Sequence, residues 1–292
     1  MKTQTYHLEF LTPCFCAGAN QNIAEVRPPS IRGKLRWWFR VVGGTIEQES
    51  EVFGSISGET GLASSLIIRV SEQTLAGVWQ PIHASGMSNT GYLLFFAQKS
   101  AGGARWAPGG AIPKGTKFTL SLVWRRKVSD AAQLVFELAL KCFLTLGTLG
   151  LRSSRGLGAF ECSEMMFNLQ DFEDLCFQVK QRSAGLYAGM GEFRGGEEQW
   201  LEGLGGQLRG LRKGYPASIR GHSNPTPLGS SQPRQASAVY LRPVRENGFA
   251  RIAVFEAPAE RVLSRASQKG APRTGDGIPA PEPPPQRSGR SR

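Results

Sequence analysis

The sequence contains few of the residues that build metal centres, disulfide frameworks and acid–base sites. Only three histidines occur among its 292 residues, and its five cysteines include no C-x-x-C pair. An odd number of cysteines without that spacing argues against a disulfide framework and against a structural zinc site. We therefore expect reduced, mostly buried thiols in a cytoplasmic protein that carries no metal ion and no cofactor.

Long apolar runs are missing as well. No stretch approaches the ~18 apolar residues of a membrane-spanning helix. Residues 1–16 also lack the continuous apolar core of an export signal. The sequence therefore predicts no membrane partner.

Catalytic patterns are equally scarce. No H-E-x-x-H segment and no paired-carboxylate pattern suggests a catalytic metal. Metal-free RNA cleavage commonly uses a histidine as general acid or base, and only His222, close to Arg220, lies in a basic setting. We interpret this histidine and its arginine neighbour as phosphate contacts, and we predict that the protein is not an enzyme.

Positive charge is what the sequence has in excess. Its 35 lysines and arginines outnumber 23 aspartates and glutamates, which gives a formal net charge of +12 and a pI near 9.9. Proteins this basic usually bind a polyanion, most often nucleic acid and less often an anionic membrane. The simpler alternative is that the excess charge only keeps the protein soluble.

The charge is most one-sided in RPPSIRGKLRWWFR (27–40), which has five basic residues, three aromatic residues and no acidic residue. Two prolines and Ser30 as the capping residue predict the start of a helix, which Gly43 and Gly44 end. On a helical wheel one stripe is apolar and consists of Ile31, Leu35, Trp38, Phe39 and Val42.

The neighbouring stripe of this helix carries three arginines at intervals of four residues, Arg32, Arg36 and Arg40. Like charges at this spacing repel each other in water, and an anion lying along them would remove the repulsion. Trp37 borders the stripe, where it could stack on a base or pack against a neighbouring subunit. The pattern favours a helix with one core face and one anion-binding face.

A second basic segment, LGTLGLRSSRGLG (146–158), follows a predicted helix at 129–147. Two arginines and two serines lie among its four glycines, which are Gly147, Gly150, Gly156 and Gly158. Glycines let a backbone approach a ligand closely, and arginines and hydroxyls suit phosphate groups. The alternative is a tight helix-to-strand turn with solvated arginines. The segment is not a Walker A site, because no G-K-[ST] follows at the required spacing.

The remaining patterns predict further elements. Strands are expected at 3–10, 64–70, 92–98, 117–124, 174–179, 237–244 and 251–257, with a turn at Asn247-Gly248 between the last two. A short strand is also expected directly after the glycine-rich loop, and an interrupted helix at 196–212. The order in the first half suggests a ferredoxin-like α+β domain. PPSIRG (28–33) is echoed by PASIRG (216–221), which would fit a second, diverged copy. We divide the chain into 1–165, 166–260 and a disordered Pro/Arg-rich tail, 261–292.

These motifs resemble those of the RAMP proteins of CRISPR systems and, more narrowly, of the first-subunit family of the type III-B Cmr effector complex. The resemblance rests on PPSIRGKLRWW (28–38), on the glycine-rich loop (147–158) and on RQASAVYLRPV (234–244). It covers residues 1 to about 257 and does not include the tail. It implies tandem ferredoxin-like domains in a subunit that caps the complex near the 3′ end of the crRNA and helps engage target RNA. Cleavage in such complexes belongs to other subunits.

The resemblance also implies RNA-facing residues. They are Arg27, Ser30, Arg32, Lys34, Arg36, Trp37 and Arg40 in the first motif, and Gly150, Arg152, Ser153, Arg155 and Gly156 in the second. The expected partners are crRNA, target RNA and other RAMP subunits. Two alternatives remain open: a metal-independent CRISPR RNA-processing endoribonuclease that uses His222, and a protein–protein adaptor whose basic helix binds an acidic subunit.

Overall fold

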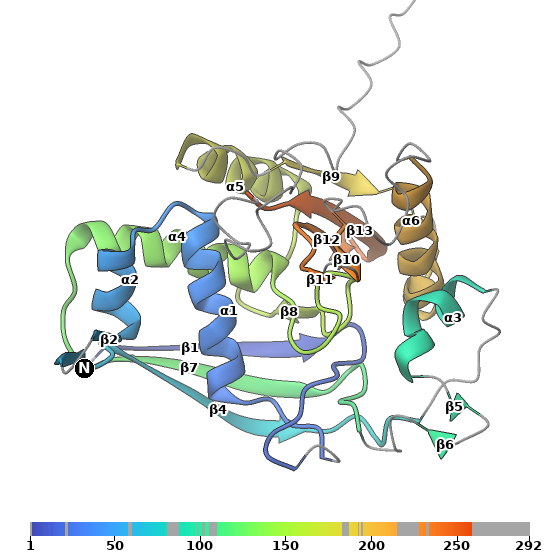
Figure 1. Cartoon of the computed structure of the whole chain (residues 1–292), viewed down its shortest axis with the longest axis horizontal. Coiled ribbons are helices and arrows are strands. Elements are labelled where there is room, and N and C mark those ends of the chain that lie inside the picture. Colours follow the sequence, from blue (N-terminus) through green and yellow to red (C-terminus); the bar gives the residue numbers. More distant parts are fainter. Residues whose placement is uncertain are drawn as a thin grey trace, which may run out of the picture.

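The computed structural model has an α+β fold in which two antiparallel sheets are packed against helices (Figure 1). The structure describes residues 2–20, 23–57, 60–80, 88–97, 99–100, 103–104, 110–182, 187–191, 193, 195–214, 228–231 and 234–258. The predicted repeat at 216–221, with Arg220 and His222, and the predicted tail at 261–292 lie outside the described residues.

The first sheet has the strand order β4-β7-β1-β8, with every neighbouring pair antiparallel. In chain order, its strands and the two long helices between them are β1 (Lys2–Phe10), α1 (Pro28–Val41), β4 (Leu66–Thr74), β7 (Lys117–Trp124), α4 (Asp130–Leu146) and β8 (Phe160–Cys162). Leu120 of β7 is paired with Tyr6 on one side and with Val70 on the other. The pattern predicted this order of elements for the first half, with one further strand, at 92–98, between the two helices.

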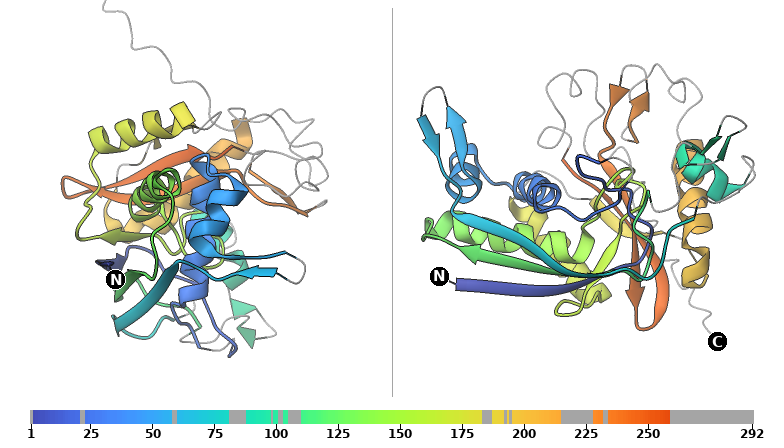
Figure 2. Two further views of the ribbon diagram at one scale, coloured as in Figure 1. Left: turned by 90° about the vertical axis from the view of Figure 1, so that its left-hand side faces the viewer. Right: turned by 90° about the horizontal axis from the view of Figure 1, so that it is seen from below.

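Between these elements lie smaller ones that the sequence pattern did not predict. They are α2 (Ile46–Phe53), the hairpin of β2 (Ser55–Ser57) and β3 (Thr60–Leu62), α3 (Asn89–Leu94), η1 (Phe95–Ala97), β5 (Lys99–Ser100) and β6 (Gly103–Ala104). The β2–β3 hairpin projects away from the body of the molecule (Figure 2). The strand predicted at 92–98 is wrong. The segment is helical because the Ser88 side chain caps α3 by accepting from the Gly91 N–H.

The second sheet, in the order β12-β13-β9, is built by the second half of the chain. That half contains α5 (Leu169–Arg182), β9 (Tyr187–Gly191), η2 (Glu197–Gln199), α6 (Trp200–Gly214), β10 (Ser230–Ser231), β11 (Arg234–Gln235), β12 (Val239–Glu246) and β13 (Phe249–Glu256). The strand predicted at 174–179 is wrong, because Phe172, Leu175 and Val179 form the buried side of α5. The predicted turn between β12 and β13 is confirmed, with Asn247 and Gly248 both at positive φ.

Side chains of the second sheet alternate between two cores. Tyr240, Val244, Ala253 and Phe255 pack with α1, α4 and the first sheet, whereas Val239, Leu241, Ile252 and Val254 pack with α3 and α6. The ring centroids of Trp38 and Phe255, from opposite halves of the sequence, are 5.4 Å apart. Both cores therefore contain residues from before and after position 165.

Two arginines of β12 reinforce this contact between the halves. Arg242 is buried and donates to the carbonyl oxygen of Phe160 in β8. Arg245 forms ion pairs with Glu161 of β8 and Glu197 of η2, and it lies 3.7 Å from Glu9 of β1. Charge and apolar packing thus join the same pair of sheets.

The cysteine prediction is confirmed for four of the five thiols. Cys14, Cys16, Cys142 and Cys162 are buried, Cys176 is half-buried, and all five are free. Among the described residues, no helix has the length and apolar character needed to cross a membrane.

Candidate nucleic-acid interface

Helix α1 is held by the predicted apolar stripe. Ile31, Leu35, Trp38 and Phe39 are all buried. The prediction of Ser30 as the helix cap is wrong. Arg27 occupies the cap position without a side-chain hydrogen bond, because the two prolines form the first turn and place Ser30 within the helix. The Ser30 hydroxyl instead lies 3.5 Å from the sulfur of Cys16.

The arginine stripe of α1 differs from its prediction. Arg36 and Arg40 both bind Glu49 of α2, with Nε–oxygen distances of 2.7 Å for each arginine. The Glu49 side chain is only 7% exposed, so this carboxylate is committed to the two arginines. The prediction that the arginines of the stripe repel each other is therefore wrong for Arg36 and Arg40, because the Glu49 carboxylate lies between them.

The third arginine of the stripe has a different environment. The Arg32 guanidinium reaches the carbonyl oxygen of Leu66 at 3.4 Å, and within the described part of the chain it forms no ion pair. Burial and the charge of Arg36 lower its pKa. At the start of the helix, Arg27 lies 3.4 Å from Glu25, and Gly33 is exposed with open space around it.

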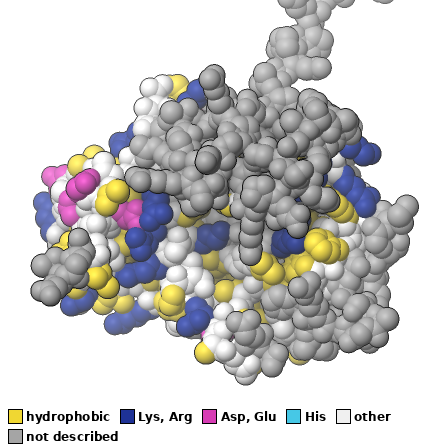
Figure 3. Space-filling model, viewed as in Figure 1, with side chains coloured by type: hydrophobic (Ala, Val, Ile, Leu, Met, Phe, Trp, Pro, Cys, Tyr) yellow, Lys and Arg dark blue, Asp and Glu magenta, His cyan; other side chains and the backbone are white. Residues whose placement is uncertain are grey.

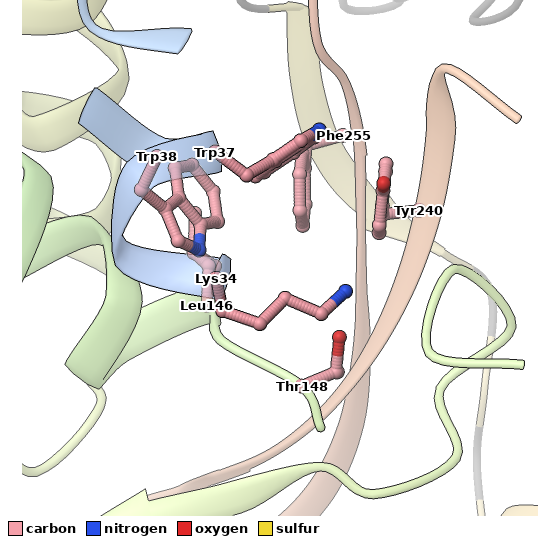
Figure 4. A pocket seen from close by; sticks show the side chains of 7 residues that line it. All are labelled: Lys34, Trp37, Trp38, Leu146, Thr148, Tyr240 and Phe255. Atoms are coloured by element: carbon pink, nitrogen blue, oxygen red, sulfur yellow. The ribbon is translucent and has the colours of Figure 1, made fainter. Parts of the chain in front are cut away.

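Lys34 connects α1 to the glycine-rich loop. Its Nζ donates to the Ser153 hydroxyl at 2.7 Å, so two predicted RNA-facing residues are brought together across a long stretch of sequence. Figure 4 shows the Lys34 side chain extending away from Trp38 toward Thr148, in a narrow recess that Trp37 and Tyr240 also line. Burial lowers the pKa of Lys34 to about 8.

Trp37 packs on aromatic residues of the protein. Its ring centroid is 4.9 Å from those of both Trp38 and Tyr240, and Tyr240 in turn stacks on Phe255. The sequence placed Trp37 at the edge of the helix, but it gave no sign of Tyr240, which arrives from β12. RNA stacking on Trp37 stays a prediction.

The glycine-rich loop is a tight turn whose glycines are required by contacts within the protein. Gly150, Gly156 and Gly158 have φ values of +79°, +81° and +66°. A Cβ on Gly150 would lie 2.6 Å from the carbonyl oxygen of Phe15, and one on Gly158 would overlap the carbonyl oxygen of Leu149. The turn is also tied to the second sheet, because the Leu241 N–H donates to the carbonyl oxygen of Ser154 at 3.0 Å. Gly156 itself is buried.

The loop arginines remain partly exposed and carry no carboxylate partner among the described residues. The Arg152 guanidinium lies 5.0 Å from the ring centroid of Phe95 and 5.1 Å from that of Phe96. Burial, followed by the charges of Arg152 and Arg212, lowers the pKa of Arg155 to about 10. Arg212, in α6, was not among the predicted residues, and only the fold brings it here.

The structure brings part of the predicted set together. Lys34 of α1 contacts Ser153, which lies between Arg152 and Arg155 in the loop, whereas Arg32 reaches Leu66 of β4 and both Arg36 and Arg40 bind Glu49 of α2. Figure 3 shows lysine and arginine side chains spread over the face that α1 presents, while the acidic side chains of this view gather toward α2. No group of three His, Cys, Asp or Glu side chains suited to a metal ion occurs among the described residues. The arrangement suits binding of a polyanion.

Comparison with known proteins identifies the class. The chain belongs to the RAMP superfamily, whose family model matches residues 7–161, more than half of its length. The match includes both α1 and the glycine-rich loop.

Curated relatives are more specific. The chain is 29% identical over 168 residues to "CRISPR system Cmr subunit Cmr1-1" of Pyrococcus furiosus, an alignment covering 54% of this chain and 44% of that protein. It is 36% identical over 69 residues to Cmr1-2 of the same organism, covering 22% of this chain and 37% of that protein. The chain therefore matches less than half the length of either relative.

Solved structures share the fold. Apo Cmr1 from Pyrococcus furiosus matches with a TM-score of 0.57 at 19% identity, covering 88% of both chains. A chain in the cryo-EM structure of a type III-B Cmr-beta complex bound to cognate target RNA matches with a TM-score of 0.54 at 10% identity, covering 87% of this chain and 94% of that one. The chain is thus a RAMP superfamily protein related to Cmr1 of type III-B CRISPR systems.

Proposed function

We propose that the protein is a non-catalytic, RNA-binding subunit of a type III-B CRISPR ribonucleoprotein. It caps the complex near the 3′ end of the crRNA and helps capture complementary target RNA. The observation that carries this proposal is the juxtaposition of Lys34 and Ser153, 2.7 Å apart, with the loop residues Arg152 and Arg155, which carry no carboxylate partner among the described residues.

The relatives support the same assignment. The curated ones are Cmr subunits, and a protein with this fold occurs in a Cmr complex bound to cognate target RNA. The expected partners are accordingly crRNA, target RNA and other RAMP subunits. Tandem ferredoxin-like domains divided near residue 165, with a separate tail from 261, complete the proposal.

The contacts divide the predicted residues into two groups. Arg32, Lys34, Arg152, Ser153 and Arg155 are proposed as the principal RNA contacts, since none of these basic side chains has a carboxylate partner among the described residues. The other predicted residues are proposed as secondary contacts. Some have side chains that already contact the protein, two are glycines, and two lie outside the described residues. They are Arg27, Ser30, Arg36, Trp37, Arg40, Gly150, Gly156, Arg220 and His222. Contacts of this kind bind phosphates and position the strand, and base pairing between guide and target supplies the sequence.

The test compares wild type with an Arg152→Gln/Arg155→Gln variant, using labelled single-stranded RNA across a salt series. The control, Arg69→Gln/Lys127→Gln, removes the same charge from two exposed positions elsewhere. Each lost phosphate contact should flatten the log–log salt slope by about 0.7. We expect the loop variant to bind roughly tenfold more weakly and the control to match wild type.

The alternatives predict different results in the same samples. If the loop variant binds RNA as wild type does, the RNA-binding proposal fails, and the result favours the alternative that the protein is a protein–protein adaptor. If wild type cuts CRISPR repeat RNA without metal and His222→Ala abolishes the cut, the protein is a processing endoribonuclease.

A further inference from the structure

Helices α3 and α6 meet so closely that a tyrosine is enclosed by arginines. A Cβ on Gly205 of α6 would overlap the carbonyl oxygen of Asn89, so this glycine permits the approach. Tyr92 lies one turn into α3. Its ring centroid is 4.8 Å from the Arg209 guanidinium and 5.6 Å from the Arg212 guanidinium. Arg212 also donates to the Tyr92 hydroxyl.

The glycine-rich loop closes this corner from a second side. A Cβ on Gly156 would lie 2.5 Å from Leu204 of α6 and 3.0 Å from Pro243, so the loop rests directly on the helix. Arg152 and Arg155 thereby come within electrostatic range of Arg212. We call Tyr92, Phe95, Arg152, Arg155, Arg209 and Arg212 the Tyr92 cluster.

The cluster brings the positive charges of Arg152, Arg155 and Arg212 close together. Among the described residues, no Asp or Glu forms an ion pair with Arg152, Arg155 or Arg212. Glu202, the acidic residue of α6, instead accepts from the N–H of Thr90 at 2.9 Å, at the start of α3. Half-buried like charges held together raise the energy of the empty site, and a bound anion would lower it.

The aromatic rings indicate which anion fits. Phe95 is 55% exposed and has the Arg152 guanidinium against its ring. Guanidinium groups interleaved with aromatic rings suit phosphates and unpaired bases together, as in proteins that bind single-stranded nucleic acid. A small anion or an acidic peptide would use the charges and leave the rings unoccupied.

We propose that the Tyr92 cluster is a second RNA subsite, in which Arg212 holds a phosphate of a single strand leaving the glycine-rich loop and Phe95 stacks on a base. This inference rests on the proposed RNA-binding function and extends it to residues of α3 and α6. A strand bound there contacts both halves of the chain.

The experiment uses the full chain and a matched pair of variants on one helix. Arg212→Gln removes a cluster charge, and Lys213→Gln removes the adjacent, exposed charge. Binding is measured for unstructured RNAs of about 6 and about 16 nucleotides, one near the short end and one at the long end of typical single-strand sites. We expect Arg212→Gln to weaken the longer RNA about fivefold with little change for the shorter, and Lys213→Gln to change neither.

A third variant, Phe95→Leu, separates stacking from charge. It should weaken the longer RNA about fivefold but leave binding of inorganic polyphosphate unchanged. Thermal melting of each variant shows that a loss of binding does not come from unfolding. The subsite proposal is overturned if Arg212→Gln binds the longer RNA as tightly as wild type does. It is also overturned if polyglutamate displaces labelled RNA from the wild-type protein as well as unlabelled RNA does. If the Arg152→Gln/Arg155→Gln variant loses RNA affinity while Arg212→Gln keeps it, the subsite is rejected and the proposed function stands.

Discussion

The two arginine-rich regions of the molecule differ in one respect. On α1, Arg36 and Arg40 converge on the buried carboxylate of Glu49. In the Tyr92 cluster, Arg152, Arg155 and Arg212 come together with aromatic rings and no carboxylate among the described residues. Part of the charge of the more conspicuous sequence motif is therefore already neutralised within the protein. A run of basic residues reports how much charge is present, whereas the fold decides how much of it can bind a ligand.

The largest expected effect concerns the glycines of the two regions. Gly158→Ala forces a Cβ against the carbonyl oxygen of Leu149 at a positive φ, and we expect the free energy of unfolding to fall by about 3 kcal/mol. Gly33→Ala, in open space on α1, should raise it by about 0.5–1 kcal/mol. Urea denaturation measures both. Equal effects would mean that the loop glycines are not required by the contacts described.

The second prediction converts one region into the other. Glu49→Gln removes the anion shared by Arg36 and Arg40, and we expect the free energy of unfolding to fall by about 2 kcal/mol. The freed guanidinium groups should steepen the salt dependence of RNA binding by up to about 1.4 log units per log unit of salt. Glu47→Gln, an exposed position on the same helix, is the control. An unchanged slope would show that the α1 stripe faces away from RNA.

The smallest predicted effect is a pH dependence that separates Lys34 from the arginines. Its pKa is lowered from 10.5 to about 8 by burial, so the folded protein loses this proton at lower pH than the unfolded chain. The contribution of Lys34 to stability therefore rises between about pH 8 and 10.5, while its charge toward RNA disappears. We expect RNA affinity to fall about threefold from pH 7 to 9 in wild type and to stay constant in Lys34→Arg. A parallel fall in both proteins would assign the effect to another group.

Local pattern was enough to predict much of the fold. The alternation in β1, the apolar body of α4 and the Asn247-Gly248 turn each carry their signal within a few residues. The apolar side of α1 was predictable for the same reason. The short apolar runs at 92–98 and 174–179 were assigned the wrong structure because such runs fit a strand or a buried helix equally well.

The site was less predictable, because its decisive contacts join distant residues. Nothing near Arg36 indicates that Glu49 neutralises it, and Tyr92 and Arg212 are brought together only when α3 packs on α6. Lys34 and Ser153 were both predicted, but not their mutual hydrogen bond. Sequence motifs thus supplied candidate residues on α1 and the loop, whereas the packing of helices determines which of them have a carboxylate partner and what lies beside them.

The backbone bond from Leu241 to Ser154 also has a consequence for how the protein is made. The glycine-rich loop leaves the ribosome well before β12, and before α6, two of the elements that contact it. Until they are synthesised, Arg155 has neither Leu241 beside its backbone nor Arg212 near its side chain. The loop part of the proposed RNA-binding surface therefore takes its final shape only after β12 has been synthesised.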